Sequence, residues 1–222
     1  MSSNARNDGS PERSKRFVTL LNAFTIVIEL GVLMPQGLGE MDLPADKVLA
    51  VAVKSNSPFL IEYLIAVMLG ITLVLSAQAL RERLQAGAPN RMRIAVIAAS
   101  VGSALFIAAG ITSFSGFPAI VAANDLAAYR ILGAVIQGLL SAAIFAYGWT
   151  TLLWGWAGLS TKGVPAVLSY VLLLAGVFAI LAFVIHILEP LGVVINVVWA
   201  FWLGYVLLTQ PATMAAPPKA TM

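Results

Sequence analysis

Six long apolar stretches, separated by short polar connections, dominate this sequence. A helix that crosses the hydrocarbon core of a bilayer needs about 20 mostly apolar residues, with a range of about 17–25. All six stretches meet this requirement, so we predict an all-α, polytopic membrane helix bundle with six transmembrane helices over residues 17–208. The polar tails, residues 1–16 and 209–222, are predicted to be disordered. The predicted spans are Phe17–Met34, Phe59–Leu80, Ile94–Phe114, Ile131–Trp154, Val164–Leu188 and Leu191–Leu208.

The composition supports lipid as the main solvent. Of the 222 residues, 60% are hydrophobic and only 10% are charged, whereas a soluble domain has about 25% charged residues. The chain has no cysteine and one histidine, which excludes thiolate metal sites and two-histidine sites built within one chain. No cofactor is predicted. The basic residues lie mainly at helix ends rather than along one face, so nucleic acid is not an expected partner.

The basic residues also predict the orientation. Cytoplasmic loops carry an excess of lysine and arginine. With the N-terminus inside, the inner segments hold ten basic residues and the outer segments hold three, Lys47, Lys54 and Arg130. An even number of spans then places both termini in the cytoplasm. The first stretch lacks a nearby small-x-small cleavage site, so we interpret it as a retained span and not a signal peptide.

Two outer loops and several small residues carry further expectations. The loops Pro35–Pro58 and Ser115–Arg130 are each expected to form a short helix on the membrane surface. Small residues let helices approach closely in lipid. We therefore expect close helix contacts at Gly102, Ser103, Gly110, Gly133 and Gly138.

Polar residues within the spans are the candidates for function. A charged side chain near the middle of a bilayer costs about 2.5–3.5 kcal/mol on insertion scales. Glu29 lies roughly 18 Å into the first span, and Asn22, Thr25 and Glu29 share one helix face. We expect a polar pocket in the outer half of the protein, with Arg130 neutralising Glu29 or Glu62. The ligand-binding or ion-pair candidates are Glu29, Glu62, Arg130, Gln137 and Asn196.

Simpler interpretations remain open for these residues. Glu62, Arg130 and Glu189 lie at helix ends, where charges are readily solvated, and Glu29 fits a protonated or paired structural carboxyl group. His186 and Glu189 are weak metal candidates that would need Glu62 nearby. No catalytic residue is predicted, because no known motif is complete.

The layout resembles a bacterial family of six-span membrane proteins known only as a domain of unknown function. The resemblance lies in three segments: ALRERLQAGAPNRMR between the second and third spans, WTTLLWGW followed by GLSTKGVPAVLSY, and the closing VVWAFWLGYVLL. It implies a multi-pass protein of the bacterial cytoplasmic membrane. The family has no established activity, so no functional residue is carried over.

The function expected from the sequence is non-enzymatic. The chain would bind a small ligand, ion or lipid, or accompany a partner in the bilayer, either another membrane protein or further copies of itself. One alternative is a small secondary transporter that works as an oligomer. Another is a membrane enzyme acting on lipid, for which Glu62, His186 and Glu189 would have to meet.

Overall fold

The computed structural model describes residues 44–54, 57–183, 185 and 189–209, and the regular structure within them is helical. Three helical stretches are long and apolar enough to cross a membrane: Tyr63–Leu84 in α3, all of α4 and all of α5. The predicted tail 1–16, the first predicted span and residues 210–222 of the second predicted tail lie outside the described residues. The described helices are α2 (Ala45–Lys54), α3 (Ser57–Leu84), α4 (Pro89–Ala123), α5 (Leu126–Thr161), α6 (Ala166–Ala182) and α7 (Glu189–Thr209).

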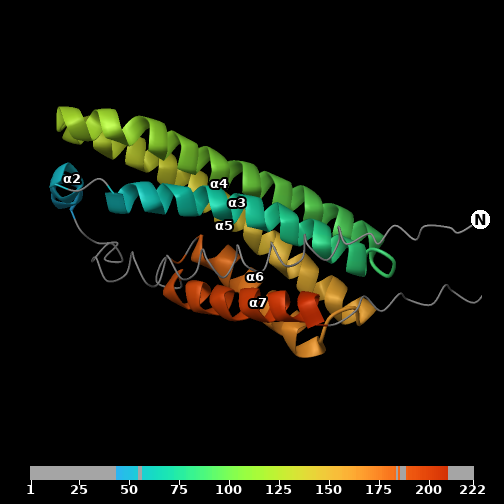
Figure 1. Cartoon of the computed structure of the whole chain (residues 1–222). Coiled ribbons are helices and arrows are strands. Elements are labelled where there is room, and N and C mark those ends of the chain that lie inside the picture. The colour runs from blue at the N-terminus through green and yellow to red at the C-terminus, as the bar shows by residue number, and fades with distance from the viewer. Residues whose placement is uncertain (1–43, 55–56, 184, 186–188, 210–222) are drawn as a thin grey trace, which may run out of the picture.

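Helices α3 to α7 run back and forth, and each packs against the next along the chain (Figure 1). Helix α7 also returns to the earlier helices. The Trp199 ring lies 6.1 Å from the rings of Tyr147 and Trp154 in α5. At the end of α3, Arg83 Nη1 donates a hydrogen bond to the Val206 carbonyl oxygen at 3.4 Å. The main core therefore lies where α3, α4, α5, α6 and α7 meet.

The α4–α5 hairpin is much longer than its neighbours and extends past the ends of α6 and α7 (Figure 1). Its helices have 35 and 36 residues, which gives lengths of about 52 and 54 Å. Two residues make the turn: Asn124 is left-handed with φ 50°, and Asp125 caps α5 by accepting a hydrogen bond from the Ala128 amide. The prediction of a separate surface helix within Ser115–Arg130 was wrong, because α4 continues through Pro118 to Ala123.

A short helix is found within the other loop, Pro35–Pro58, as predicted, and it is α2; its predicted place on the membrane surface stays a prediction. Leu49 and Ala52 are buried, and α2 contacts α4 and α5 near the turn between them. Ala52 belongs to a small core that includes Tyr63 and Phe117. Helix α2 is therefore fixed to the same end of the bundle as the α4–α5 turn.

The break predicted at Glu189-Pro190 is found as two separate helices, since α6 ends at Ala182 and α7 begins at Glu189. Pro190 is tolerated there because the first turn of a helix needs no amide donor. Helix α6 is shorter than the predicted span Val164–Leu188. Its end lies beside the middle of α5, where the rings of Phe183 and Phe145 are 5.4 Å apart. The first half of α5 therefore lacks α6 as a neighbour.

Glycines bring the second half of α5 against α6. A Cβ at Gly155 would lie 2.6 Å from the Ser169 carbonyl oxygen, and one at Gly176 would lie 2.7 Å from the Gly148 carbonyl oxygen. Such distances leave no room for a side chain, so the two backbones are in direct contact. Sequence reasoning missed this contact surface, which we call the α5–α6 seam.

The predicted small-residue contacts are partly confirmed. Gly102 lies against Ala143 and Ala146 of α5, and Gly110 lies against the backbone of Tyr63 in α3. Ser103 is buried as well. The prediction was wrong for Gly133 and Gly138, because a Cβ at either position would meet nothing within 4 Å. Both glycines lie on the half of α5 that α6 does not reach.

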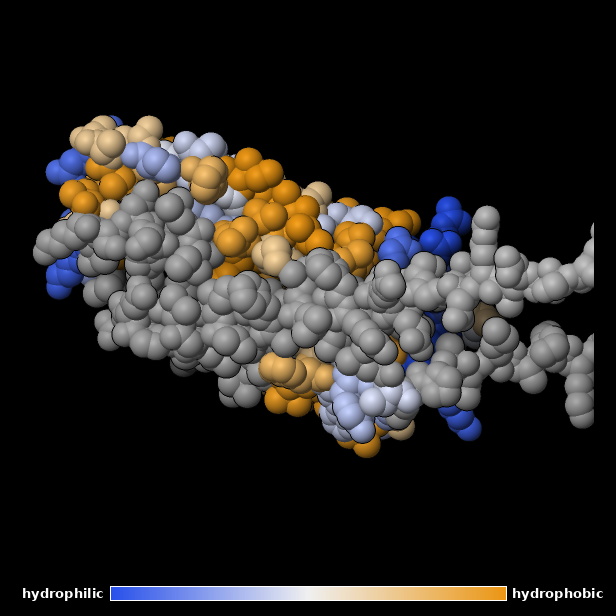
Figure 2. All heavy atoms as spheres, viewed as in Figure 1, coloured by the Kyte–Doolittle hydropathy of each residue, from blue (hydrophilic) through white to orange (hydrophobic). Residues whose placement is uncertain are grey.

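On the face drawn in Figure 2, hydrophobic side chains lie along the described helices and hydrophilic ones gather toward the two ends. On α4 the exposed large apolar residues run from Ile94 to Phe114, a rise of about 30 Å. This equals the usual thickness of the hydrocarbon core. Buried hydroxyls satisfy themselves within their own helices, as Thr150 does by donating to the Ala146 carbonyl oxygen at 2.9 Å. We call the stretch level with Ile94–Phe114 the apolar band.

Candidate functional site

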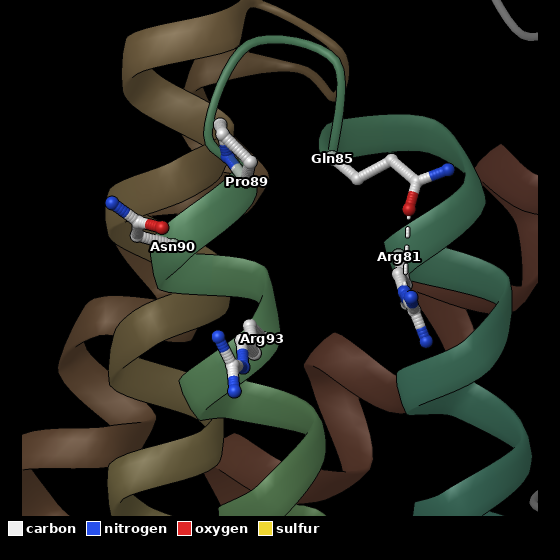
Figure 3. A pocket seen from close by; sticks show the side chains of 5 residues that line it. All are labelled: Arg81, Gln85, Pro89, Asn90 and Arg93. Atoms are coloured by element: carbon white, nitrogen blue, oxygen red, sulfur yellow. Dashed lines mark hydrogen bonds between the residues drawn. The ribbon is translucent and has the colours of Figure 1, made fainter.

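The described residues contain a polar pocket at the α3–α4 turn, opposite the end where the sequence places its candidates. The pocket has a volume of about 340 Å³ and opens to solvent. Figure 3 shows Arg81 and Gln85 at the end of α3, and Pro89, Asn90 and Arg93 at the start of α4 on the other side of the turn. We call this site the basic pocket. It is lined by Arg81, Gln85, Pro89, Asn90 and Arg93.

The local sequence explains the shape of the turn. The Leu84 carbonyl oxygen accepts from the Gly87 and Ala88 amides, which closes α3. Pro89 then begins α4, a position where its missing amide costs no hydrogen bond. Gly87 lies against Thr161, and a Cβ there would come within 2.7 Å of the threonine methyl carbon. The end of α5 is therefore held beside the turn.

The pocket is rich in positive charge. Residues 81–93 contain four arginines and one glutamate. Arg81 Nε donates to Gln85 Oε1 at 3.2 Å, drawn as a dashed line in Figure 3. Within the described part of the chain, neither Arg81 nor Arg93 pairs with a carboxylate. Both guanidinium groups therefore keep donors available for an anion.

Two neighbouring arginines are already engaged in structure. Arg91 donates to Ser160 Oγ at 2.8 Å, and its guanidinium carbon lies 4.3 Å from the centre of the Trp156 ring. Arg83 contacts the Val206 carbonyl oxygen. These two residues tie α3 and α4 to α5 and α7, while the two pocket arginines stay exposed.

Helix α4 adds a partial positive charge. Its N-cap residue, Ala88, has no side chain that accepts a hydrogen bond from the first turn. The amides at a helix start and the helix dipole favour anions. Because Asn90 and Arg93 lie in the first turns of α4, a bound anion would meet side chains and helix start together.

The basic pocket lies at the edge of the apolar band. Arg93 directly precedes Ile94, the first residue of the band on α4. A side chain at that level reaches the headgroup region of a bilayer. The pocket is therefore at the height of lipid phosphates when the band lies in the hydrocarbon core.

The residues predicted from the sequence are described to different extents. Glu29 and His186 lie outside the described residues. Glu62 falls on α3, and Glu189 and Asn196 fall on α7, but their side chains are not described. Arg130 and Gln137 are both exposed on the first half of α5. Among the described residues, no three histidine or acidic side chains are grouped as a metal site would require.

Three aromatic rings bring Glu62 and Arg130 to the same end of the bundle. Tyr63 stacks on Phe117 with ring centres 5.4 Å apart, and Phe117 contacts Tyr129 at 5.0 Å. Glu62 and Arg130 are the sequence neighbours of the two tyrosines. Their backbones therefore lie at one level, close to the α4–α5 turn.

Sequence reasoning treated the arginines of the α3–α4 loop only as signals of orientation. Arg81 and Arg93 are separated by twelve positions around Gly87 and Pro89, and antiparallel helices joined by such a turn place these two positions opposite each other. That spacing was the available signal. It predicts two facing arginines but not the pocket between them.

No family model, curated protein or solved structure matches this chain. The resemblance to six-span proteins therefore stays a prediction.

Proposed function

We propose that this protein is a six-span, non-enzymatic membrane protein whose basic pocket binds the phosphate of an anionic ligand at the cytoplasmic surface. The pocket carries the proposal. Two arginines that pair with no carboxylate among the described residues, two amide side chains and an uncapped helix start line one cavity at the edge of the apolar band. Basic pockets between transmembrane helices on the cytoplasmic side are suited to anionic headgroups.

The six-span arrangement rests on three observations. Helices α3, α4 and α5 each contain a stretch that is long and apolar enough to cross a membrane. The apolar α6 and α7 form an antiparallel pair beside them. Phe17–Met34 is long and apolar enough for one more crossing. The excess of arginine at the α3–α4 turn then favours a cytoplasmic location for this end and for both termini, in the bacterial inner membrane that the resemblance implies.

Thermal unfolding in detergent tests the ligand proposal. Phosphatidylglycerol should raise the melting temperature of the wild type, since a ligand that binds the folded state stabilises it, whereas phosphatidylcholine should not. The double variant Arg81→Gln/Arg93→Gln should lose most of the shift. Arg130→Gln is the matched control, because it removes one exposed cation from the opposite end, and it should keep the shift.

The remaining outcomes separate the sources of phosphate. A shift with inorganic phosphate alone, lost in the double variant, would identify a free phosphate compound as the ligand. An equal lipid shift in the wild type and the double variant would contradict the proposal, because the binding would then not depend on the pocket.

A second binding site at the α4–α5 end is favoured by one observation, the aromatic contacts that bring the positions of Glu62 and Arg130 to one level. In this proposal Arg130 holds Glu62 ionised beside a small ligand or cation. Divalent cations should raise the melting temperature of the wild type but not of Glu62→Gln. If divalent cations raise the melting temperature of Glu62→Gln as much as that of the wild type, this second site would be contradicted.

A further inference from the structure

The first half of α5 carries polar and small residues on a face that no described helix covers. Arg130, Ala134, Gln137 and Gly138 are exposed there, and Ser141 is half-buried. We call these five residues the open face. Around Gly138 there is space, since a Cβ would meet nothing within 4 Å.

Part of the open face lies inside the apolar band. Gly116 of α4 lies against Leu132 of α5, and this pairing puts Gln137 level with Ile111. Ile111 is 58% exposed and belongs to the band. A primary amide facing hydrocarbon has no water to bond. Gln137 therefore needs a polar neighbour that the described helices do not provide.

We infer that the chain's own first apolar segment, Phe17–Met34, lies along the open face and places Glu29 beside Ser141 and Gln137. The segment supplies what the face needs: Asn22, Thr25 and Glu29 share one side of a helix. The inference goes beyond the proposed ligand but uses the proposed crossing by this segment.

Lengths and connections agree with this placement. Arg16 precedes the segment as Arg93 precedes the apolar band, so the two arginines mark one level. Counted from the first apolar residue after each arginine, Glu29 lies about 18 Å into the bilayer. Ser141, placed by the pairing of Gly116 with Leu132, lies about 20 Å into it.

Arg130 lies about 36 Å from the same level. That separation favours Ser141 and Gln137 over Arg130 as partners of Glu29. The chain then leads from Met34 to α2, which packs against α5 and α4 at the α4–α5 end. The chain that follows the segment therefore continues to the end of the bundle where the open face begins.

Disulfide cross-linking tests the inference directly, because the natural chain has no cysteine. The pair Glu29→Cys/Ser141→Cys should form an intramolecular disulfide in membranes. A second pair, Leu33→Cys/Gly138→Cys, lies one helical turn further along both partners and should behave alike, so the test survives if the first pair fails to fold. The control Glu29→Cys/Ala104→Cys uses an exposed site on α4 about 15 Å from the same level and should not cross-link.

Three results would overturn the inference. A disulfide-linked dimer from Ser141→Cys alone would show that a second copy covers the face. Equal cross-linking of Glu29→Cys with Ser141→Cys and with Ala104→Cys would show random encounter. If both cysteine pairs are folded, as shown by a single size-exclusion peak, and neither cross-links, lipid and not the first segment covers the open face. Lipid binding at the basic pocket is measured separately, so either proposal can fail alone.

Discussion

The two halves of α5 use glycine in opposite ways. In the second half, Gly148 and Gly155 hold the backbone against α6, with no room for a methyl group. In the first half, Gly133 and Gly138 have open space around them. The difference follows from the end of α6 at Ala182, beside Phe145. A glycine in a membrane helix thus marks close packing only where another helix reaches it.

Trp154 should be the most sensitive residue of the packed half. It is fully buried and its ring lies 6.1 Å from that of Trp199. Trp154→Ala should lower the free energy of unfolding by about 3 kcal/mol, since a large cavity is left. Trp149→Ala, at a 45% exposed position of the same helix, should cost much less. Equal losses in SDS titrations would show that Trp154 is not in the core.

Substitutions in the α5–α6 seam should give the next largest loss of stability. Gly155→Ala should destabilise the protein by about 1–3 kcal/mol, because its methyl group would lie 2.6 Å from the Ser169 carbonyl oxygen. Gly133→Ala is the matched control and should be neutral or stabilise by up to about 1 kcal/mol, as alanine favours helix. Similar unfolding curves for both variants would remove the contrast between the halves.

Gly138→Leu sharpens the comparison at the open face. If Phe17–Met34 covers this face, the larger side chain should separate the helices and lower stability by about 1 kcal/mol. If lipid covers it, the change should be neutral. The melting temperature of Gly138→Leu in detergent distinguishes the two kinds of cover, with Ile111→Leu as the control.

The smallest effect is expected at the edge of the packed half, where Arg91 lies over the Trp156 ring. Trp156→Leu should cost about 0.5–1 kcal/mol, the usual range for an exposed cation–π contact. Arg91→Gln should cost less in the Trp156→Leu background than in the wild type, the remaining loss being that of the hydrogen bond to Ser160 Oγ. Additive losses in that double-mutant cycle would mean that the two side chains are not coupled.

The sequence predicted the helical class, α2 and the separation of α6 from α7, because apolar length and proline position are local properties. It did not predict how far α4 and α5 extend beyond the band, since alanines and Pro118 near the turn look like a loop. That stretch is helical in the bundle, where Phe117 packs between Tyr63 and Tyr129.

The candidate site was less predictable for a physical reason. The sequence search followed carboxylates inside the apolar stretches, where charge is costly. The basic pocket depends instead on which arginines remain unpaired, and that depends on tertiary contacts such as Arg91 with Ser160. The spacing of Arg81 and Arg93 alone does not reveal these contacts.

The orientation of the α4–α5 hairpin tests the account most directly. Ala86 and Ala123 are exposed at its two ends and tolerate cysteine in a chain that has none of its own. In intact cells, a membrane-impermeant maleimide should label Ala123→Cys, and should label Ala86→Cys only after permeabilisation. Labelling of both positions from the same side would contradict a hairpin crossing the bilayer with its basic pocket in the cytoplasm.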